Sequence, residues 1–122
     1  MKSILLIEDD LFIVDIYSKK LKEAGFSVEV ANDGQQALKK LKDHKSDLLL
    51  LDIVLPNIDG WEFLREIRNE PSLKDLQVIV LSNLSQKSEI EKSKELGAIR
   101  YLVKAYYTPT QVVEEIKTIL EK

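Results

Sequence analysis

The chain has 122 residues, of which 44% are hydrophobic and 32% are charged, so it suits one compact domain over residues 1–122 and leaves no length for a second. A net charge of −3 provides no basic surface for a phosphate backbone, and we expect no direct binding to nucleic acid. The chain has no cysteine, which excludes disulfides and thiolate catalysis. With neither a signal-peptide pattern nor an apolar run of roughly 20 residues, we expect a cytoplasmic protein without membrane contact.

The first half of the chain predicts three strands with two helices between them. Residues 3–7 and 47–51 are runs of Leu and Ile without polar alternation after a first polar residue, which is typical of strands covered on both faces of a sheet. Residues 26–32 alternate apolar and polar side chains, as expected for a strand at the edge of the sheet. Apolar residues at helical spacing predict a helix over residues 11–24, and a second helix is expected near residues 33–41.

The second half continues the alternation of helices and strands. A helix is expected near residues 60–68, and residues 77–81, in which Val, Ile and Leu follow one Gln without polar alternation, predict a further buried strand. The helix over residues 86–96 offers few apolar side chains to a core, so we expect it to pack weakly. Residues 99–104 alternate in part and predict a second edge strand. The last helix is expected to follow Thr108, which serves as its N-cap ahead of a proline.

This order of elements predicts an α/β domain with one parallel sheet. Strand–helix–strand units with short connections form right-handed crossovers, which place helices on both faces of the sheet. Of the two common strand orders for a doubly wound (βα)5 domain, edge strands at residues 26–32 and 99–104 select the order 2-1-3-4-5. The chain then reverses direction between strands one and three, and a crevice for a ligand opens at their carboxyl ends.

Charged and hydroxyl side chains follow or end four of the predicted strands at this edge of the sheet: Glu8, Asp9, Asp10, Asp52, Ser82 and Lys104. Carboxylates that share a crevice repel one another unless a cation joins them. Oxygen ligands without His or Cys suit Mg²⁺, which takes one or two carboxylates together with water and phosphate oxygens. We therefore expect a Mg²⁺ site here, in which Mn²⁺ substitutes, whereas Asp10 is expected to cap the following helix.

Asp52 is the best-placed nucleophile in this group. A carboxylate can attack a phosphoryl group and form an aspartyl phosphate. Mg²⁺ and the Lys104 ammonium would neutralise charge on the transferring oxygens, while the Ser82 hydroxyl would donate to one of them. The residues thus predict phosphoryl transfer to Asp52.

Four motifs, LLIEDD, LLLLDIVLPNIDG, VIVLS and YLVK, occur in this order and together resemble the receiver domains of two-component response regulators, the class of the chemotaxis protein CheY. The resemblance covers the whole chain and implies a flavodoxin-like, CheY-like fold. It implies a domain that accepts a phosphoryl group on Asp52 from a sensor histidine kinase, a phosphotransfer protein or a small acyl phosphate. Such a domain is not an enzyme toward other substrates, because it catalyses only its own phosphorylation and dephosphorylation. No output domain is expected within this length.

The resemblance also assigns the metal ligands. It makes Asp9 and the backbone carbonyl of Val54 direct ligands beside Asp52, while Glu8 acts through water. These assignments come from the match to the family's motifs.

A second set of roles concerns switching. By the resemblance, Ser82 is the hydroxyl residue that turns to the phosphoryl group, Lys104 pairs with that group, and Tyr101 changes rotamer with the hydroxyl. Phosphorylation then alters the fourth helix, fifth strand and fifth helix, where a downstream protein or a second copy binds.

The chain departs from the family pattern near the expected site. Most receivers have a cis proline after the conserved lysine, but here Ala105 follows it. A cis bond to a residue other than proline costs about 3 to 4 kcal/mol, so this loop is expected to be trans or strained. Asn83 replaces a small residue and is expected to narrow access to the phosphoryl group. Val54 and Leu84 are apolar at two positions that, in this family, help to set the rate at which the aspartyl phosphate is hydrolysed. Their apolar side chains predict a long-lived phosphorylated form.

The sequence argues against two other functions. A haloacid-dehalogenase-type hydrolase needs a second acid two residues after its nucleophile, where this chain has Val54, and a flavodoxin-like electron carrier needs a hydroxyl- and glycine-rich loop where this chain has IEDDLF. A docking scaffold of the same fold that is not phosphorylated stays open as an alternative. Trp61 is expected to be a packing residue and His44 a solvated one.

Overall fold

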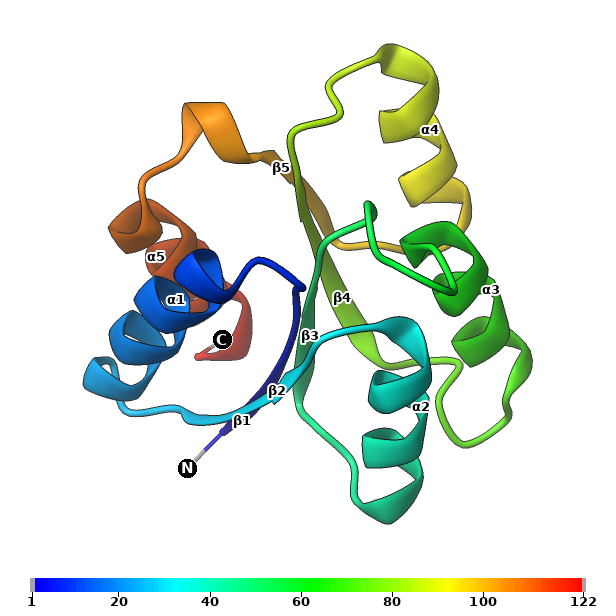
Figure 1. Cartoon of the computed structure of the whole chain (residues 1–122), viewed down its shortest axis with the longest axis horizontal. Coiled ribbons are helices and arrows are strands. Elements are labelled where there is room, and N and C mark those ends of the chain that lie inside the picture. The colour runs from blue at the N-terminus through cyan, green and yellow to red at the C-terminus, as the bar shows by residue number, and fades with distance from the viewer. Residues whose placement is uncertain (1, 122) are drawn as a thin grey trace.

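The computed structural model describes residues 2–121, which form a five-stranded parallel sheet between two layers of helices (Figure 1). The sheet has the order β2-β1-β3-β4-β5, which confirms the order predicted from the two edge-like strands. Every neighbouring pair is parallel. The strands are β1 (Ser3–Ile7), β2 (Ser27–Ala31), β3 (Leu48–Leu51), β4 (Gln77–Ser82) and β5 (Arg100–Val103).

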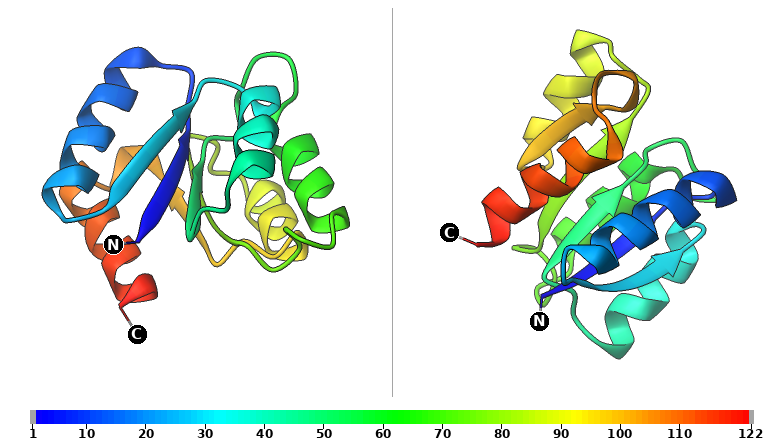
Figure 2. Two further views of the ribbon diagram at one scale, coloured as in Figure 1. Left: turned by 90° about the horizontal axis from the view of Figure 1, so that it is seen from below. Right: turned by 90° about the vertical axis from the view of Figure 1, so that its left-hand side faces the viewer.

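The helices divide between the two faces of the sheet. Figure 1 shows α1 and α5 on one side and α2, α3 and α4 on the other, and the two views of Figure 2 show the same layers from below and from the side. The five α-helices and one short 3-10 helix are α1 (Leu11–Glu23), α2 (Gly34–Asp43), α3 (Gly60–Asn69), α4 (Lys87–Glu95), η1 (Lys104–Tyr106) and α5 (Pro109–Leu120).

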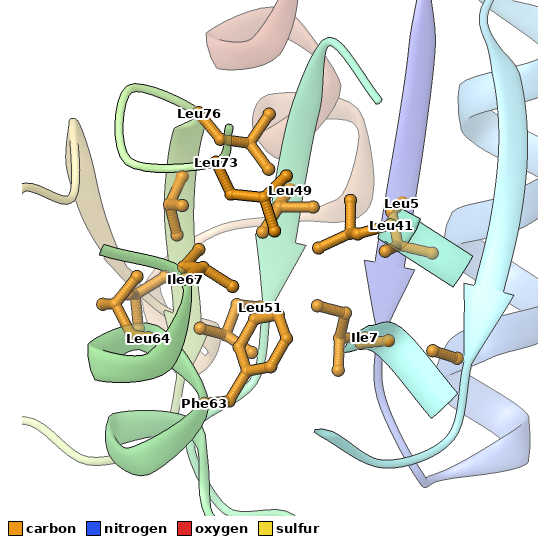
Figure 3. Packing of buried hydrophobic residues seen from close by; sticks show 14 of the residues in the cluster. Leu5, Ile7, Leu41, Leu49, Leu51, Phe63, Leu64, Ile67, Leu73 and Leu76 are labelled. Carbon is orange, nitrogen blue, oxygen red and sulfur yellow. The ribbon is translucent and has the colours of Figure 1, made fainter. Parts of the chain in front are cut away.

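Alternate strand residues supply two separate apolar layers, one for each face of the sheet. Leu5 and Ile7 of β1 belong to the layer beneath α2 and α3, whereas Ile4 and Leu6 face α1 and α5. Figure 3 shows the first layer, in which Phe63 of α3 lies close to the strand residues. Burial on both faces explains why the central strands read as continuous apolar runs. It also holds the strand ends, and hence the residues that follow them, in fixed positions.

Side-chain caps set the points at which several helices begin. Asp10 caps α1 by accepting from the Phe12 backbone N–H at 2.9 Å, as the sequence predicted. Thr108 caps α5 in a reciprocal capping box with Gln111, which confirms the predicted start of that helix. Such caps satisfy backbone N–H groups that lack partners within the helix.

The end of the fifth strand differs from the prediction. Lys104 was expected to end the strand, but β5 stops at Val103 and Lys104 begins η1, because the Tyr107 N–H turns back to the Lys104 carbonyl at 3.4 Å. Residues 2–121 contain no cis peptide bond, so the bond from Lys104 to Ala105 is trans.

The fourth helix packs differently from the other helices. Weak packing was predicted, and Ile90 and the C-cap residue Leu96 are only half-buried, although Leu96 packs against the core layer. The buried side chain of α4 is Ser93, whose hydroxyl donates to the Ile90 carbonyl at 2.7 Å. No helix among residues 2–121 combines the length and the apolar character needed to cross a lipid bilayer.

Candidate functional site

The predicted site, here called the pocket and made of Glu8, Asp9, Asp52 and Lys104, lies where β1, β3 and β5 end. The segments that follow these strands leave the sheet on its upper side in Figure 1, and they carry Glu8 and Asp9, Asp52, and Lys104 respectively. All strands run in the same direction, so their carboxyl ends lie at one edge of the sheet, and these residues converge there although Glu8 and Lys104 are 96 positions apart and β4 lies between β3 and β5. The structure therefore brings together four of the residues that the sequence placed at this edge.

Lys104 bridges two of the carboxylates. Its Nζ donates to Glu8 Oε1 at 2.8 Å and to Asp52 Oδ2 at 2.9 Å. The three side chains are 14%, 3% and 8% exposed, respectively, so this is an ion network largely removed from water. An unpaired charge at such a site would be costly, and the lysine compensates both acids at once.

Burial sets the proton affinities of this network. Loss of solvation raises the pKa of Glu8 above its ordinary value, even though the hydrogen bond from Lys104 opposes that change. Burial acts to lower the pKa of Lys104, but its hydrogen bonds to Glu8 and Asp52 outweigh this effect and leave the pKa above its ordinary value. At neutral pH Lys104 therefore remains an ammonium.

The carboxylates of Glu8, Asp9 and Asp52 form an all-oxygen group suited to a divalent cation. One oxygen from each lies within 4.8 Å of the others. Glu8 and Asp52 are buried, whereas Asp9 is exposed and faces the solvent side of the group. This donor set fits a hard cation such as Mg²⁺ or Mn²⁺.

The loop after β3 is held tightly against Asp52. The Val54 backbone N–H donates to Asp52 Oδ1 at 3.1 Å, which fixes the carboxylate and brings the Val54 backbone to the pocket. Gly60 closes the loop by donating from its N–H to the Ile53 carbonyl at 2.8 Å. A Cβ on Gly60 would lie 2.5 Å from the Ile53 Cα, so glycine is required for this approach.

Ser82 and Tyr101 meet at the backbone of a third residue, Leu84. The buried Ser82 hydroxyl accepts from the Leu84 N–H at 3.3 Å, and the Tyr101 hydroxyl donates to the Leu84 carbonyl at 2.5 Å. Burial raises the pKa of Tyr101, so its hydroxyl stays protonated and can donate. The two predicted switch residues are thus linked through the loop that leads to α4.

Two contacts of α4 were not predicted from the sequence. Trp61 is buried, as expected of a packing residue, but its Nε1 also donates to Glu89 Oε2 at 2.8 Å. Arg68 donates to the carbonyls of Leu96 and Gly97 at 2.7 and 3.2 Å. Both contacts join α3 to α4 across 28 or 29 positions, and no local pattern in the sequence indicates them.

The sequence matches one protein family over most of its length. The family model of the response regulator receiver domain, which describes its sequences, matches residues 4–117 of this chain. The alkaline phosphatase synthesis transcriptional regulatory protein PhoP of Bacillus subtilis is 32% identical over 99% of this chain and 49% of its own length. The transcriptional regulatory protein CusR of Escherichia coli is 31% identical over 98% of this chain and 51% of its own length. The chain thus spans about half the length of these curated relatives.

Solved structures show the same fold. The chemotaxis protein CheY4 of Vibrio cholerae superposes with a TM-score of 0.90 at 28% identity, covering 98% of this chain and 99% of the other. The Mn²⁺-bound response regulator Rcp1 gives a TM-score of 0.86 at 29% identity over 97% and 93% of the two chains. The phosphorylated cyanobacterial phytochrome response regulator RcpA gives 0.84 at 31% identity over 98% and 91%.

Proposed function

Because this chain belongs to the response regulator receiver domain family, we propose that it is a phosphorylation switch in which Asp52 accepts a phosphoryl group. The donor is the phosphohistidine of a sensor kinase or phosphotransfer protein, or a small acyl phosphate. One observation carries this proposal: the Lys104 ammonium lies 2.9 Å from Asp52 within a group of three carboxylates suited to a divalent cation.

The chain's own groups account for the transfer step. An Asp52 carboxylate oxygen attacks phosphorus, the bond from phosphorus to the donor nitrogen or oxygen breaks, and the leaving group keeps the electron pair. The Val54 N–H holds the carboxylate in place, and Lys104 supplies positive charge for the phosphoryl oxygens. We assign this domain no reaction on other substrates, so it catalyses only its own phosphorylation and dephosphorylation.

Asp9, Asp52 and the Val54 carbonyl would hold Mg²⁺ directly, and Glu8 would act through water. When bound, the cation neutralises charge on the transferring oxygens. The oxygen-only donor set supports this assignment, and so does the Mn²⁺-bound relative Rcp1. Lys104 donates a hydrogen bond to one oxygen of Glu8 and to one oxygen of Asp52. The exposed Asp9 is therefore the carboxylate most accessible to the cation.

Four exposed apolar side chains that closely follow pocket residues in the sequence, here called the apolar rim, favour a protein donor. Leu11, Phe12, Val54 and Tyr106 are all well exposed, and each lies two or three positions from a pocket residue. Such a rim fits the apolar surface of a phosphohistidine-bearing protein and would exclude water during transfer. Phe12→Ser and Tyr106→Ser should slow transfer from a phosphorylated kinase but leave phosphorylation by acetyl phosphate unchanged. Lys20→Ser, an exposed change elsewhere on α1, serves as the control, and equal slowing with both donors would contradict a docking role.

We place the output of the switch in α4, β5 and α5, which would bind a downstream protein or a second copy of the chain after phosphorylation. The alternative is a docking scaffold of the same fold that acts without phosphorylation. The intact group of acids and lysine favours the switch over the scaffold.

Intact-mass measurement after incubation with acetyl phosphate and Mg²⁺ tests the proposal. Wild type should gain one phosphoryl group, whereas a chelator or the Asp52→Ala substitution should abolish the gain. Circular dichroism of the variant checks that it is folded. An unmodified wild type would favour the scaffold, and equal modification of both proteins would place the phosphoryl group elsewhere.

A further inference from the structure

Helix α4 has little apolar burial to hold it in place. Ser93 is its buried side chain, while Glu89, Ile90 and Lys92 are half-buried. Within the described residues, its N-cap, Gln86, makes no side-chain capping bond. The position of this helix therefore depends on specific polar contacts with its neighbours.

At the start of α4, two oppositely charged side chains contact a single indole. The Trp61 Nε1–H donates to Glu89 Oε2 at 2.8 Å, and the Lys92 Nζ lies 5.4 Å from the centroid of the ring. An indole N–H is a donor only, and its ring face attracts a cation, so Glu89 and Lys92 satisfy both features of the same side chain. Trp61 is buried in the core layer of α3 and gives this contact a fixed base.

Trp61 is itself connected to the phosphorylation site through the backbone. It follows Gly60, whose N–H donates to the Ile53 carbonyl and whose Cα packs so closely that a Cβ would lie 2.9 Å from the Asp52 carbonyl oxygen. The start of α3 cannot shift independently of the residue that carries the phosphoryl group. The indole is therefore fixed relative to the pocket.

The start of α4 is connected to the pocket by a different route. Four residues separate Ser82 from the first residue of α4, and Leu84, in the middle, is held by the hydroxyls of Ser82 and Tyr101. If Ser82 turns its hydroxyl toward a phosphoryl group on Asp52, it releases the Leu84 N–H and frees this segment. The far end of α4 stays fixed, since Arg68 holds the Leu96 and Gly97 carbonyls.

We infer that the contact of Trp61 with Glu89 and Lys92 is a latch that holds the start of α4 in the unphosphorylated protein and opens when Asp52 is phosphorylated. Trp61 is then a positioning residue for the output helix, and α4 pivots about the end held by Arg68. This inference rests on the proposed phosphorylation of Asp52. It adds the contact through which this chain transmits that event to α4.

Hydrogen exchange of the backbone amides of residues 87–95 tests the latch in the unphosphorylated protein. Glu89→Ala should speed exchange several-fold, because the indole loses its acceptor. Glu91→Ala, an exposed change on the same helix, should leave exchange at the wild-type rate. Glu89→Gln keeps an acceptor oxygen and should restore most of the protection. Equal rates in Glu89→Ala and wild type would overturn the inference.

The same measurement on phosphorylated protein tests the opening, with intact mass as an independent check of phosphorylation. Wild-type exchange in α4 should rise toward that of Glu89→Ala, whereas phosphorylation of Glu89→Ala should add little. An equal increase in both proteins would show that phosphorylation acts on α4 by another route and would overturn the latch. If wild type gains no phosphoryl group, the proposed function and the opening step both fail, while the unphosphorylated comparison still decides whether Trp61 holds α4.

Discussion

At the scale of single residues, the pocket depends on one ammonium placed between two buried carboxylates. Lys104 contacts Glu8 and Asp52 at hydrogen-bonding distance, and all three side chains are largely removed from water. Removing one member of such a network leaves the others buried and uncompensated, which costs more than the network itself contributes. The lysine therefore affects stability as well as the proposed phosphoryl transfer.

Replacing Lys104 by Met should lower the free energy of unfolding by about 3 kcal/mol at neutral pH in the presence of a chelator. The pKa of Glu8 is already raised by burial, so the folded state binds its proton more strongly than the unfolded state, and stability falls as pH rises above the ordinary value of 4.5. Without Lys104 that pKa rises further. The deficit of the variant should therefore be smallest at acidic pH, where Glu8 is protonated, and grow toward neutrality.

Urea unfolding at a series of pH values measures this effect, and Lys87→Met, a change at an exposed lysine, is the matched control. If the difference in free energy of unfolding between Lys104→Met and wild type does not vary with pH, the variant is destabilised by lost packing and not by lost charge compensation. In wild type, the pKa of Lys104 is raised above its ordinary value of 10.5. The contribution of Lys104 to stability is therefore complete below pH 10.5 and is lost as the pH rises through the raised pKa.

Val54 and Leu84 should make the phosphorylated form long-lived. Val54 is 60% exposed beside Asp52, and Leu84 follows Ser82 by two positions, but neither side chain can orient an attacking water by hydrogen bonding. The double variant Val54→Asn, Leu84→Glu should therefore lose its phosphoryl group faster than wild type. Intact mass followed over time after removal of acetyl phosphate gives both rates, and identical decay would refute the role of these positions.

At the scale of elements, α4 is held by α3 at both ends. The Arg68 guanidinium donates to the Leu96 and Gly97 carbonyls at the end of α4. It also donates to the Lys74 and Leu76 carbonyls in the loop before β4, at 2.8 Å each. This guanidinium is half-buried, and its partial burial lowers its pKa from the ordinary value. One side chain thus joins α3, α4 and the loop before β4.

Arg68→Ala should destabilise the fold by about 2 kcal/mol, because four backbone carbonyls lose a charged donor. Arg65→Ala, an exposed change on the same helix, should stay within about 0.5 kcal/mol of wild type. Urea denaturation of the two variants beside wild type makes the comparison. Similar losses in both variants would mean that the Arg68 contacts contribute little to stability.

Elements defined by local patterns were predicted well, and contacts between distant elements were not. Strand β1 has the predicted bounds because polar residues border its apolar run, and α5 begins where Thr108 caps it. Lys104 was assigned to a strand because residues 99–104 alternate in part, whereas the turn that places it in η1 depends on a backbone hydrogen bond. The contacts of Trp61 and Arg68 with α4 depend on how two helices pack, which sequence spacing does not specify.

At the scale of the whole molecule, the site results from the topology. A parallel sheet of order β2-β1-β3-β4-β5 brings the ends of β1 and β3 side by side and places β5 on the same edge. That Asp9, Asp52 and Lys104 lie at one edge of the sheet could therefore be predicted from the strand order. The specific pairing of Lys104 with Glu8 could not, because it depends on side-chain reach and burial.

The central claim is that this edge of the sheet directs a phosphoryl group to one carboxylate among several. Borohydride reduces an acyl phosphate to an alcohol, so it converts a phosphorylated aspartate to homoserine, which peptide mass spectrometry can locate. After treatment with acetyl phosphate and Mg²⁺, we predict reduction at Asp52 and at no other acid. Reduction at Asp9, at Asp59 or spread over several surface carboxylates would contradict the account.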